Sequence, residues 1–399
     1  MEDFTARQKF LENMSFNKGS KSLKGEFGFW SKTLKEWYKD GLINSIDGFE
    51  SINKLPDGLT VLGNLLGRTP DPNQEIINYD EFVSGDVINY FNFDKNFIKL
   101  PINLLPCISA ETLEDDSEYT VYRNEFGAKI KTTKKDNSYI VLEQEIKNNK
   151  DFEKFKEKVI IDIKKRFPSN FEVYIKEFKE RDYVLSLGGW PIGIFSFGRE
   201  VLGLTDYLMT FYDDPKFINN ILNFLCDFIT EILTYVLDKV DIDFFLYWED
   251  MAFKNGSLLS PKLFNEFMVP VYKKINGVLR DYGVKNIWVD SDGDITELIP
   301  LWLDSGITCL APMEVQAGMD IVNVRKKYPK LQIVGGIDKK SIAKGRAEID
   351  RELLKIPFML KSGGYIPSID HSVPPDIAWE DFKYYRNNLN QLINTYSTA

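Results

Sequence analysis

The feature that most constrains the fold is an alternation of short β-rich runs with longer helical patterns. In the helical patterns apolar residues recur every three or four positions, as at Phe152, Phe155 and Val159. The β-rich runs number eight, at residues 23–30, 97–105, 183–187, 241–248, 285–289, 307–310, 331–334 and 364–367. Strands that alternate with helices form parallel sheets, and eight of them close a barrel. The sequence therefore predicts an α/β protein with a single (β/α)8 TIM barrel.

Two segments fall outside this alternation. Residues 1–22 precede the first run and are predicted to form an N-terminal helical extension. Residues 119–123 and 128–132 are rich in β-forming residues and are joined by a short turn, which predicts a β-hairpin inserted at about 118–133. The chain has no internal repeat and no low-complexity linker, so residues 23–399 are expected to form one domain.

Charge and cysteine content narrow the class of function. Lys and Arg number 50 against 60 Asp and Glu, and the net charge of −10 argues against nucleic acid as a partner. The most apolar stretch, residues 217–240, carries Asp227, Glu231 and Asp238, which favours a buried helix over a membrane span. The start lacks a signal-peptide pattern, and the three cysteines are odd in number and far apart. We therefore expect a cytoplasmic protein without membrane association or disulfides.

Acidic side chains follow the later β-rich runs, at the strand ends where barrel enzymes place their chemistry. The only histidine follows the last run. These candidate acid–base or cation-binding residues are Glu249, Asp290, Asp292, Glu314, Asp338 and His371. Carboxylates held close together cannot all ionise cheaply, so some of them keep a proton or bind a cation. The alternative for any single acid is that it caps the following helix.

Common local motifs do not identify the chemistry. Asp290-x-Asp292-x-Asp294 resembles the start of a calcium loop, but its glycine comes too early and Leu301 stands where the final glutamate belongs. The Gly-Gly pairs do not complete a phosphate-binding or dinucleotide-binding pattern. The sequence contains no G-x-S-x-G, which argues against a serine hydrolase of that type.

Several longer motifs occur in a fixed order along the chain. They are Glu26-Phe-Gly-Phe-Trp30, Glu249-Asp250, Asp290-x-Asp292-Gly293, Gly318-Met-Asp320, Gly335-Gly-Ile-Asp338 and His371-x-x-Pro374-Pro375. This ordered set resembles the uroporphyrinogen decarboxylase superfamily over nearly the whole chain from about Gly25. The resemblance implies one barrel with an open funnel for a tetrapyrrole or another flat or methylated substrate. The layout is closer to the cobamide-dependent methyltransferase-like branch than to the decarboxylases of heme synthesis.

The sequence departs from both branches of that family. Decarboxylases carry an arginine-rich segment on the first strand, but residues 25–30 contain no arginine. Methyltransferases of the family bind zinc through His-x-Cys-Gly and a later cysteine, and the corresponding places here are Asp290-x-Asp292-Gly293 and His371. A thiolate zinc site is therefore not expected, although Asp290, Asp292 and His371 could hold a harder divalent metal ion. The resemblance also places His371 where the decarboxylases have a functional histidine.

The leading hypothesis is transfer of a methyl group from a small donor to a corrinoid carried by a partner protein. In this hypothesis Glu249, Asp290, Asp292 and His371 protonate or polarise the leaving atom of the donor. The substrate pocket would be lined by the remaining candidates: Phe29, Trp30, Trp190, Phe195, Phe197, Arg199, Glu314 and Asp338. For the aromatic residues the alternative is plain core packing.

Two other hypotheses stay open. The first is cofactor-free decarboxylation of a porphyrinogen or a related carboxylic acid, with Arg199 and Lys254 as candidate anion contacts. The second is a barrel that binds a tetrapyrrole or corrinoid without turning it over. Bound metal, turnover and ligand affinity distinguish these hypotheses.

Overall fold

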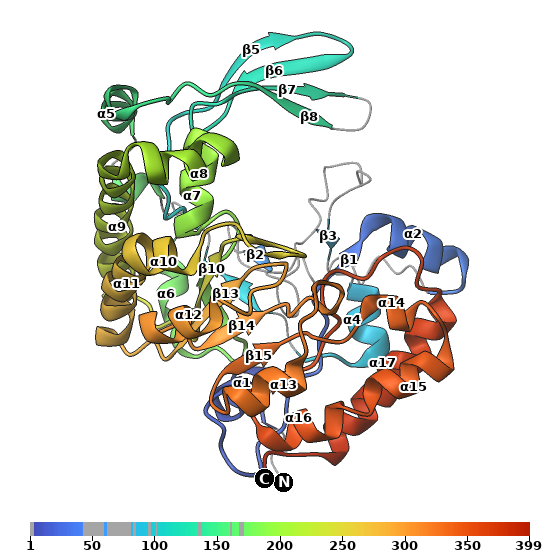
Figure 1. The fold of residues 1–399 in the computed structure, drawn as a ribbon. Coiled ribbons are helices and arrows are strands. Elements are labelled where there is room, and N and C mark those ends of the chain that lie inside the picture. The colour runs from blue at the N-terminus through green and yellow to red at the C-terminus, as the bar shows by residue number, and fades with distance from the viewer. Residues whose placement is uncertain are drawn as a thin grey trace.

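The computed structural model describes residues 4–42, 60–61, 81–82, 85–94, 97–100, 102–134, 138–159, 162–166 and 171–399. Within these ranges the chain forms a central parallel sheet with helices around it and a separate antiparallel sheet (Figure 1). The central sheet is the part that positions the candidate site.

Seven parallel strands form the central sheet of the described chain, and they lie side by side in sequence order. They are β4 Ile98–Lys99, β9 Leu185–Gly188, β10 Phe244–Trp248, β13 Asn286–Asp290, β14 Cys309–Ala311, β15 Gln332–Val334 and β16 Tyr365–Ile366. A short strand, β2 Thr60–Val61, runs antiparallel beside β4. The last seven predicted β-rich runs therefore supply the parallel strands, which confirms the α/β class.

The first predicted strand, residues 23–30, is not part of this sheet, so the described strands do not close the predicted eight-stranded barrel. Only β1 Phe29–Trp30 is a strand here, and it pairs antiparallel with β3 Glu81–Phe82. The backbone just before β1 hydrogen-bonds to a loop instead of to a strand. The Val373 N–H donates to the carbonyl oxygen of Gly28 at 2.8 Å. A hydrogen bond to a loop satisfies a backbone group as well as a ladder bond does.

An apolar cluster fills the inside of the curled sheet. Inward-facing strand residues form most of it, and Leu23 and Phe27 contribute from the segment that replaces the eighth strand. Helix α1 Ala6–Met14 closes the end where the strands begin. Its Phe10 is fully buried, with the ring centroid 5.7 Å from that of Trp288. Helix α1 of the N-terminal extension is therefore part of the core inside the curled sheet.

Helices follow the strands as the alternation predicts. Those flanking the first described strands are α2 Ser31–Lys39, α4 Gly85–Phe91, α5 Asn149–Lys158, α6 Phe171–Lys179, α7 Ile194–Leu202, α8 Leu204–Asp213 and α9 Pro215–Leu237. The later ones are α10 Pro261–Leu263, α11 Val269–Asp281, α12 Ile299–Ser305, α13 Ile321–Lys327, α14 Lys339–Ile342, α15 Arg346–Leu353, α16 Ile356–Ser362 and α17 Trp379–Thr395.

Helix α9 corresponds to the apolar stretch at residues 217–240. Asp214 caps its first turn, and Pro215 occupies the first helical position. By length and composition α9 is the described helix that could cross a membrane. Its apolar face is instead packed into the main core cluster, and the helix contacts α11 and α5.

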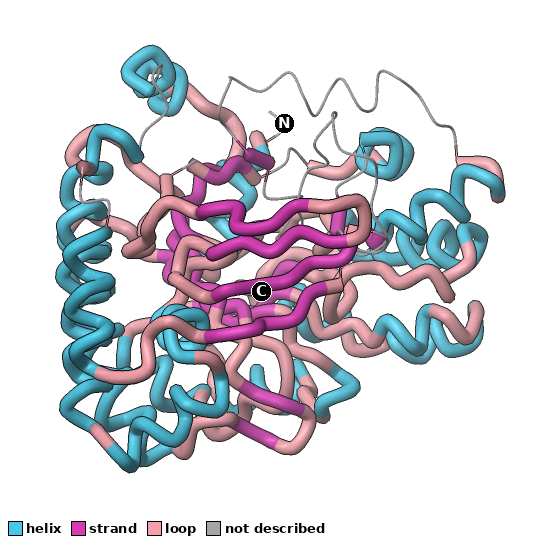
Figure 2. Tube along the Cα trace, turned by 90° about the horizontal axis from the view of Figure 1, so that it is seen from above, coloured by secondary structure: helices cyan, strands magenta, loops and turns pink. Residues whose placement is uncertain are grey.

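The inserted sheet has four antiparallel strands in sequence order: β5 Glu111–Asp115, β6 Tyr119–Arg123, β7 Lys129–Thr133 and β8 Tyr139–Glu143. The expected hairpin coincides with β6 and β7, so the insertion extends beyond residues 118–133 on both sides. The sheet stands at the top of the molecule in Figure 1 and lies over the central sheet when viewed from above (Figure 2).

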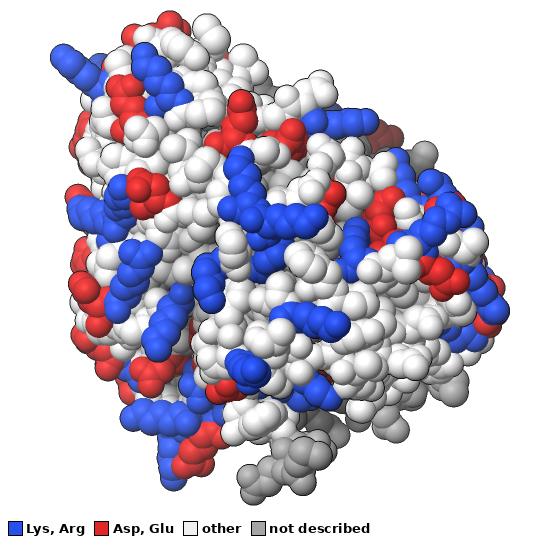
Figure 3. Space-filling view, turned by 60° about the horizontal axis from the view of Figure 1, so that its bottom comes forward, with Lys and Arg blue, Asp and Glu red and all other residues white. Residues whose placement is uncertain are grey.

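Basic side chains gather at the opposite face, where the strands begin. Helices of an α/β barrel run back toward this face, and the partial negative charge of their last turns favours Lys and Arg there. Figure 3 shows basic side chains across this face. Exposed last-turn residues of this kind are Lys176, Lys179, Arg280, Lys326, Lys327 and Lys361.

Candidate active site

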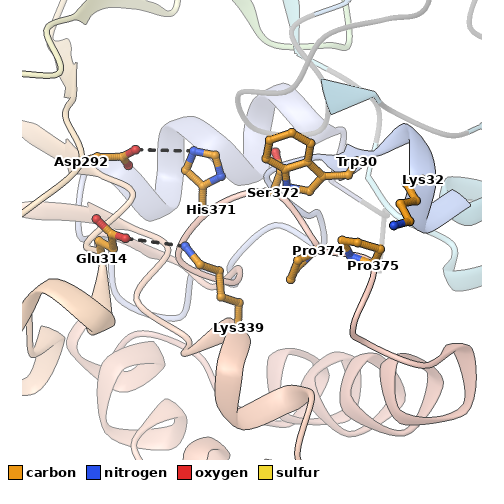
Figure 4. A pocket seen from close by; sticks show the side chains of 9 residues that line it. All are labelled: Trp30, Lys32, Asp292, Glu314, Lys339, His371, Ser372, Pro374 and Pro375. Carbon is orange, nitrogen blue, oxygen red and sulfur yellow. Dashed lines mark ion pairs between the residues drawn. The ribbon is translucent and has the colours of Figure 1, made fainter. Parts of the chain in front are cut away.

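A cavity of about 720 Å³ opens where the parallel strands end (Figure 4). Its walls come from β1, the start of α2 and the loops after β13, β14, β15 and β16. The lining residues are Trp30, Lys32, Asp292, Glu314, Lys339, His371, Ser372, Pro374 and Pro375. The volume is that of a pocket for a small molecule, and its place is that of a barrel active site.

His371 and Asp292 meet in this cavity although they are far apart in sequence. The His371 Nε2 atom lies 3.5 Å from Asp292 Oδ2, and both side chains are partly exposed. The Phe27 ring stacks on the imidazole at a centroid distance of 5.3 Å. The loops after β13 and β16 thus bring together an acid and a base, as the sequence predicts for these two residues.

Asp250 adds a second carboxylate behind Asp292. Burial, and then the negative charge of Asp292, raise the pKa of Asp250 to about 6, against the opposing charges of Arg199 and His371. The Asp292 N–H points to Asp250 Oδ1 at 3.5 Å. Asp250 has a positive φ of 43°, which non-glycine residues rarely adopt. The pair therefore keeps a proton at a higher pH than an isolated aspartate does.

Lys339 and Glu314 form a charged pair on the floor of the cavity. Lys339 Nζ lies 3.8 Å from Glu314 Oε1 and 3.9 Å from Asp370 Oδ1. Asp370 is fully buried and accepts hydrogen bonds from the backbone N–H groups of Val315 at 2.8 Å and Lys339 at 3.1 Å. One carboxylate thus fixes the loops after β14, β15 and β16 to each other.

Glu249 lies outside the cavity lining. Its fully buried carboxylate accepts hydrogen bonds from the N–H groups of Ile194 and Phe195, each at 2.8 Å, and from the Tyr272 hydroxyl. Burial nevertheless raises the pKa of Glu249 to about 7. Its position at the start of α7 is that of an anion held by a helix N-terminus.

Other predicted site residues are placed apart from the cavity lining. Asp290 ends β13, and its carbonyl accepts a hydrogen bond from the Glu249 N–H. Asp338 caps α14, accepting from Lys340 N–H and Ser341 Oγ. The cap favours a role in the fold for Asp338, and the role of the Asp290 side chain stays a prediction.

The aromatic residues predicted to line the pocket divide into buried core residues and residues at the surface or the cavity. Phe29, Phe195 and Phe197 are buried in the core, whereas Trp30 lines the cavity. Trp190 is about half exposed and packs edge-on against Trp248.

Arg199 lies close to the acid cluster without lining the cavity. Its guanidinium sits 4.9 Å from the centre of the Trp248 ring and donates a hydrogen bond to the Asp250 carbonyl at 3.1 Å. Arg199 thus holds the backbone of Asp250 in place through this hydrogen bond.

The residues present do not fit the zinc site of the methyltransferase branch. Among the side chains within the described ranges, no group of three or more His, Cys, Asp or Glu is arranged to hold a metal ion. Cys226 and Cys309 are buried in the core, and Cys107 lies in the loop after β4. Of the predicted metal set, Asp292 and His371 lie together in the cavity, and the role of Asp290 as a third ligand stays a prediction.

Sequence reasoning named the pair Glu249-Asp250 but took Glu249 as the site residue, and it missed Lys339, Asp370 and Ser372. These residues, like Asp250, directly adjoin a predicted residue: Glu249, Asp338 or His371. Neighbouring residues at a strand end point in different directions, and sequence alone does not show which one faces the cavity.

An α/β fold with a charged cavity at the carboxyl ends of its parallel strands is the architecture of barrel enzymes. The family model of uroporphyrinogen decarboxylase (URO-D) matches residues 116–391. The chain therefore belongs to the uroporphyrinogen decarboxylase family. No curated protein matches it.

Solved structures support the fold. A methyltransferase from Methanosarcina mazei is similar with a TM-score of 0.56 and 12% identity, covering 97% of this chain and all of that chain. A 3-keto-L-gulonate-6-phosphate decarboxylase from Vibrio cholerae has a TM-score of 0.24 and 12% identity, covering 53% of this chain and 86% of that chain. The first likeness, at 12% identity, supports the fold alone. The second is too distant to add to the argument.

Proposed function

We propose that this chain is an enzyme that removes a methyl group from a small donor and passes it to a corrinoid carried by a partner protein. The observation that carries the proposal is the cluster of Asp250, Asp292 and His371 beside a cavity for a small molecule. A methyl group bound to oxygen or nitrogen leaves a strongly basic atom behind, so its transfer needs a proton donor at that atom.

The cluster supplies this proton from groups that face the cavity. Asp292 and His371 reach the substrate, and Asp250 keeps a proton nearby because two adjacent carboxylates do not both ionise cheaply. The corrinoid would accept the methyl group from the open side of the cavity.

Decarboxylation of a small acid is the second candidate, and the cationic side chains of the cavity favour it. Lys32 and Lys339 both line the pocket and could hold a carboxylate. The same acid cluster would then protonate the carbon from which carbon dioxide leaves.

The two candidates are separated by product analysis. We would incubate the chain with oxygen-, nitrogen- and sulfur-linked methyl donors and chemically reduced cobalamin, and measure methylcobalamin by absorbance. Released carbon dioxide would be measured in parallel with carboxylic acids. Methylcobalamin without carbon dioxide supports the proposal, and carbon dioxide alone selects the second candidate.

The variants Asp292→Asn and His371→Gln should lower turnover by about 10²- to 10⁴-fold, the usual contribution of an acid–base group. The matched control is Asp304→Asn, which removes the same charge from an exposed surface pair with Lys273. Since Asp250 loses its proton at about pH 6, turnover should fall as the pH rises through that value. Unchanged turnover in both site variants would contradict the proposal.

A further inference from the structure

Residues 26–28, which lie in the segment that replaces the eighth strand, hold the loop that carries His371. The first of them accepts a hydrogen bond from the Ile369 N–H, and the ring of the second stacks on the imidazole. The carbonyl of the third accepts from the Val373 N–H at 2.8 Å. Three consecutive residues therefore contact every second residue of the loop, before, at and after the histidine.

The bond to Ile369 takes the place of a bond between two strands. On one side Ile369 forms a parallel bridge with Ile337, in which the Asp370 N–H donates to the Ile337 carbonyl at 2.8 Å. In a parallel ladder the N–H of the bridged residue itself points the other way, here toward residues 23–30. Its acceptor there is Glu26 Oε1 at 2.7 Å, and Glu26 is only 1% exposed. A side-chain oxygen thus supplies the acceptor that a strand carbonyl supplies in a closed barrel.

Two residues of α17 fix this carboxylate in turn. Glu26 Oε2 accepts a hydrogen bond from the Tyr385 hydroxyl at 3.2 Å and another from Arg386 Nη1, also at 3.2 Å. Neither side chain of the ion pair between Glu26 and Arg386 is exposed. Neither charge can move away without leaving the other buried and unpaired, which is costly. The ion pair therefore also fixes the oxygen that faces Ile369.

We propose that Glu26 is a positioning residue for His371. By fixing the Ile369 N–H, Glu26 sets where the loop leaves the sheet and so holds His371 Nε2 at 3.5 Å from Asp292 Oδ2. This role rests on the proposed function, in which His371 and Asp292 act together on the substrate. The role is tested through a contact within the protein and not through turnover, so either one can fail without the other.

The chain has only one histidine, so the imidazole signals in a nuclear magnetic resonance spectrum of histidine-labelled protein belong to His371. Asp292→Asn removes the charge beside Nε2 and should shift these signals when both spectra are recorded at the same pH. Neighbouring residues are coupled in this way and distant ones are not. The size of the shift therefore reports whether the imidazole is held against Asp292.

Two double variants separate the hydrogen bond to Ile369 from the ion pair. They are Glu26→Gln/Arg386→Met and Glu26→Leu/Arg386→Met. When both partners of a buried ion pair are replaced by uncharged residues of similar size, the fold is often as stable as before, whereas loss of one partner leaves a buried charge unpaired. Gln keeps an acceptor for the Ile369 N–H, and Leu does not. Circular dichroism checks that each variant keeps the fold.

The shift caused by Asp292→Asn should persist in Glu26→Gln/Arg386→Met and should be lost in Glu26→Leu/Arg386→Met. The matched control is Asp243→Leu/Arg181→Met, which removes a second buried ion pair, with its atoms 3.0 Å apart, where β10 begins. Asp243 also accepts a hydrogen bond from a backbone N–H, that of Leu185 at 2.9 Å. The control variant should keep the shift, because this pair does not contact the His371 loop.

Equal shifts in the two variants at position 26 would overturn the proposal, since the acceptor for Ile369 would then make no difference to the imidazole. Loss of the shift in the Gln variant or in the control would overturn it as well, because loss of charge or of any buried pair would then suffice. A wild-type chain without the shift would contradict the contact between Asp292 and His371 itself. If the shifts are as expected but turnover does not depend on these two residues, the positioning role is supported and the proposed function is wrong.

Discussion

Adjacent acidic residues have different environments in this molecule. Glu249 turns to the start of α7 and is fully hydrogen-bonded there, whereas Asp250 turns to Asp292 and His371. Burial raises the pKa of both carboxyl groups. An acid with a purely structural role can have a raised pKa as well. A raised pKa therefore identifies an acid of the active site only when the geometry also places that acid there. The sequence could predict the meeting of Asp292 and His371 but not this division of roles.

The buried position of Glu249 makes its contribution to stability depend on pH. The folded chain holds the Glu249 proton up to about pH 7, against an ordinary pKa of 4.5. The unfolded chain loses this proton at a lower pH than the folded chain does. The free energy of unfolding therefore falls by about 3 kcal/mol as the pH rises between these two values. Glu249→Gln has no such titration, so the difference in unfolding free energy, wild type minus variant, should fall over this range. Urea unfolding at several pH values measures it, and a constant difference would contradict the assignment.

At the scale of elements, the loops at the strand ends are held by close backbone approaches. Gly293 follows Asp292 with a φ of +87°, and a Cβ atom there would lie 2.5 Å from the backbone of Ala252. The Gly293 N–H also donates to Glu314 Oε2 at 3.0 Å. The glycine therefore lets the loop after β13 lie against the turn after β10, which places Asp292 at the cavity.

Gly293→Ala should destabilise the chain more than a glycine substitution that meets only backbone strain. Gly283→Ala is the matched control, since Gly283 has a φ of +82° and nothing within 4 Å of the added Cβ. The difference between the two variants should be about 1–3 kcal/mol, the usual cost of overpacking. Denaturant unfolding of both variants tests this, and equal losses would show that the close approach does not matter.

Prediction of elements from sequence was least successful where pairing depends on distant partners. The sequence does not predict β5 or β8, because β5 is acidic and β8 is a short apolar run. Both segments become strands by pairing with their neighbours, β5 with β6 and β8 with β7. Residues 23–30 have the composition of a strand, but only Phe29–Trp30 forms one, and it pairs outside the central sheet. The helices were easier, since their stripes and caps are local signals.

For the molecule as a whole, the inside of the curled sheet depends on a helix that precedes it. α1 packs Phe10 against Phe244 and Trp288 from the end where the strands begin. Phe10→Ala should therefore lower the unfolding free energy by about 3–5 kcal/mol, the cost of an aromatic cavity in a core. Phe4, which is 59% exposed, gives the matched control, and Phe4→Ala should change stability by less than about 0.5 kcal/mol. A small loss in Phe10→Ala would mean that α1 only covers the barrel.

The basic face at the strand beginnings and the acid cluster at the strand ends also separate charge across the molecule. The chain carries a net charge of −10, yet the end away from the cavity is rich in Lys and Arg. An anionic surface therefore attracts the end away from the cavity and leaves the cavity, whose lining carries two acids and two lysines, facing solvent. Added salt weakens this attraction over a distance of about 8–10 Å. The helix ends that stabilise the fold thus also help to orient the whole molecule beside a charged surface.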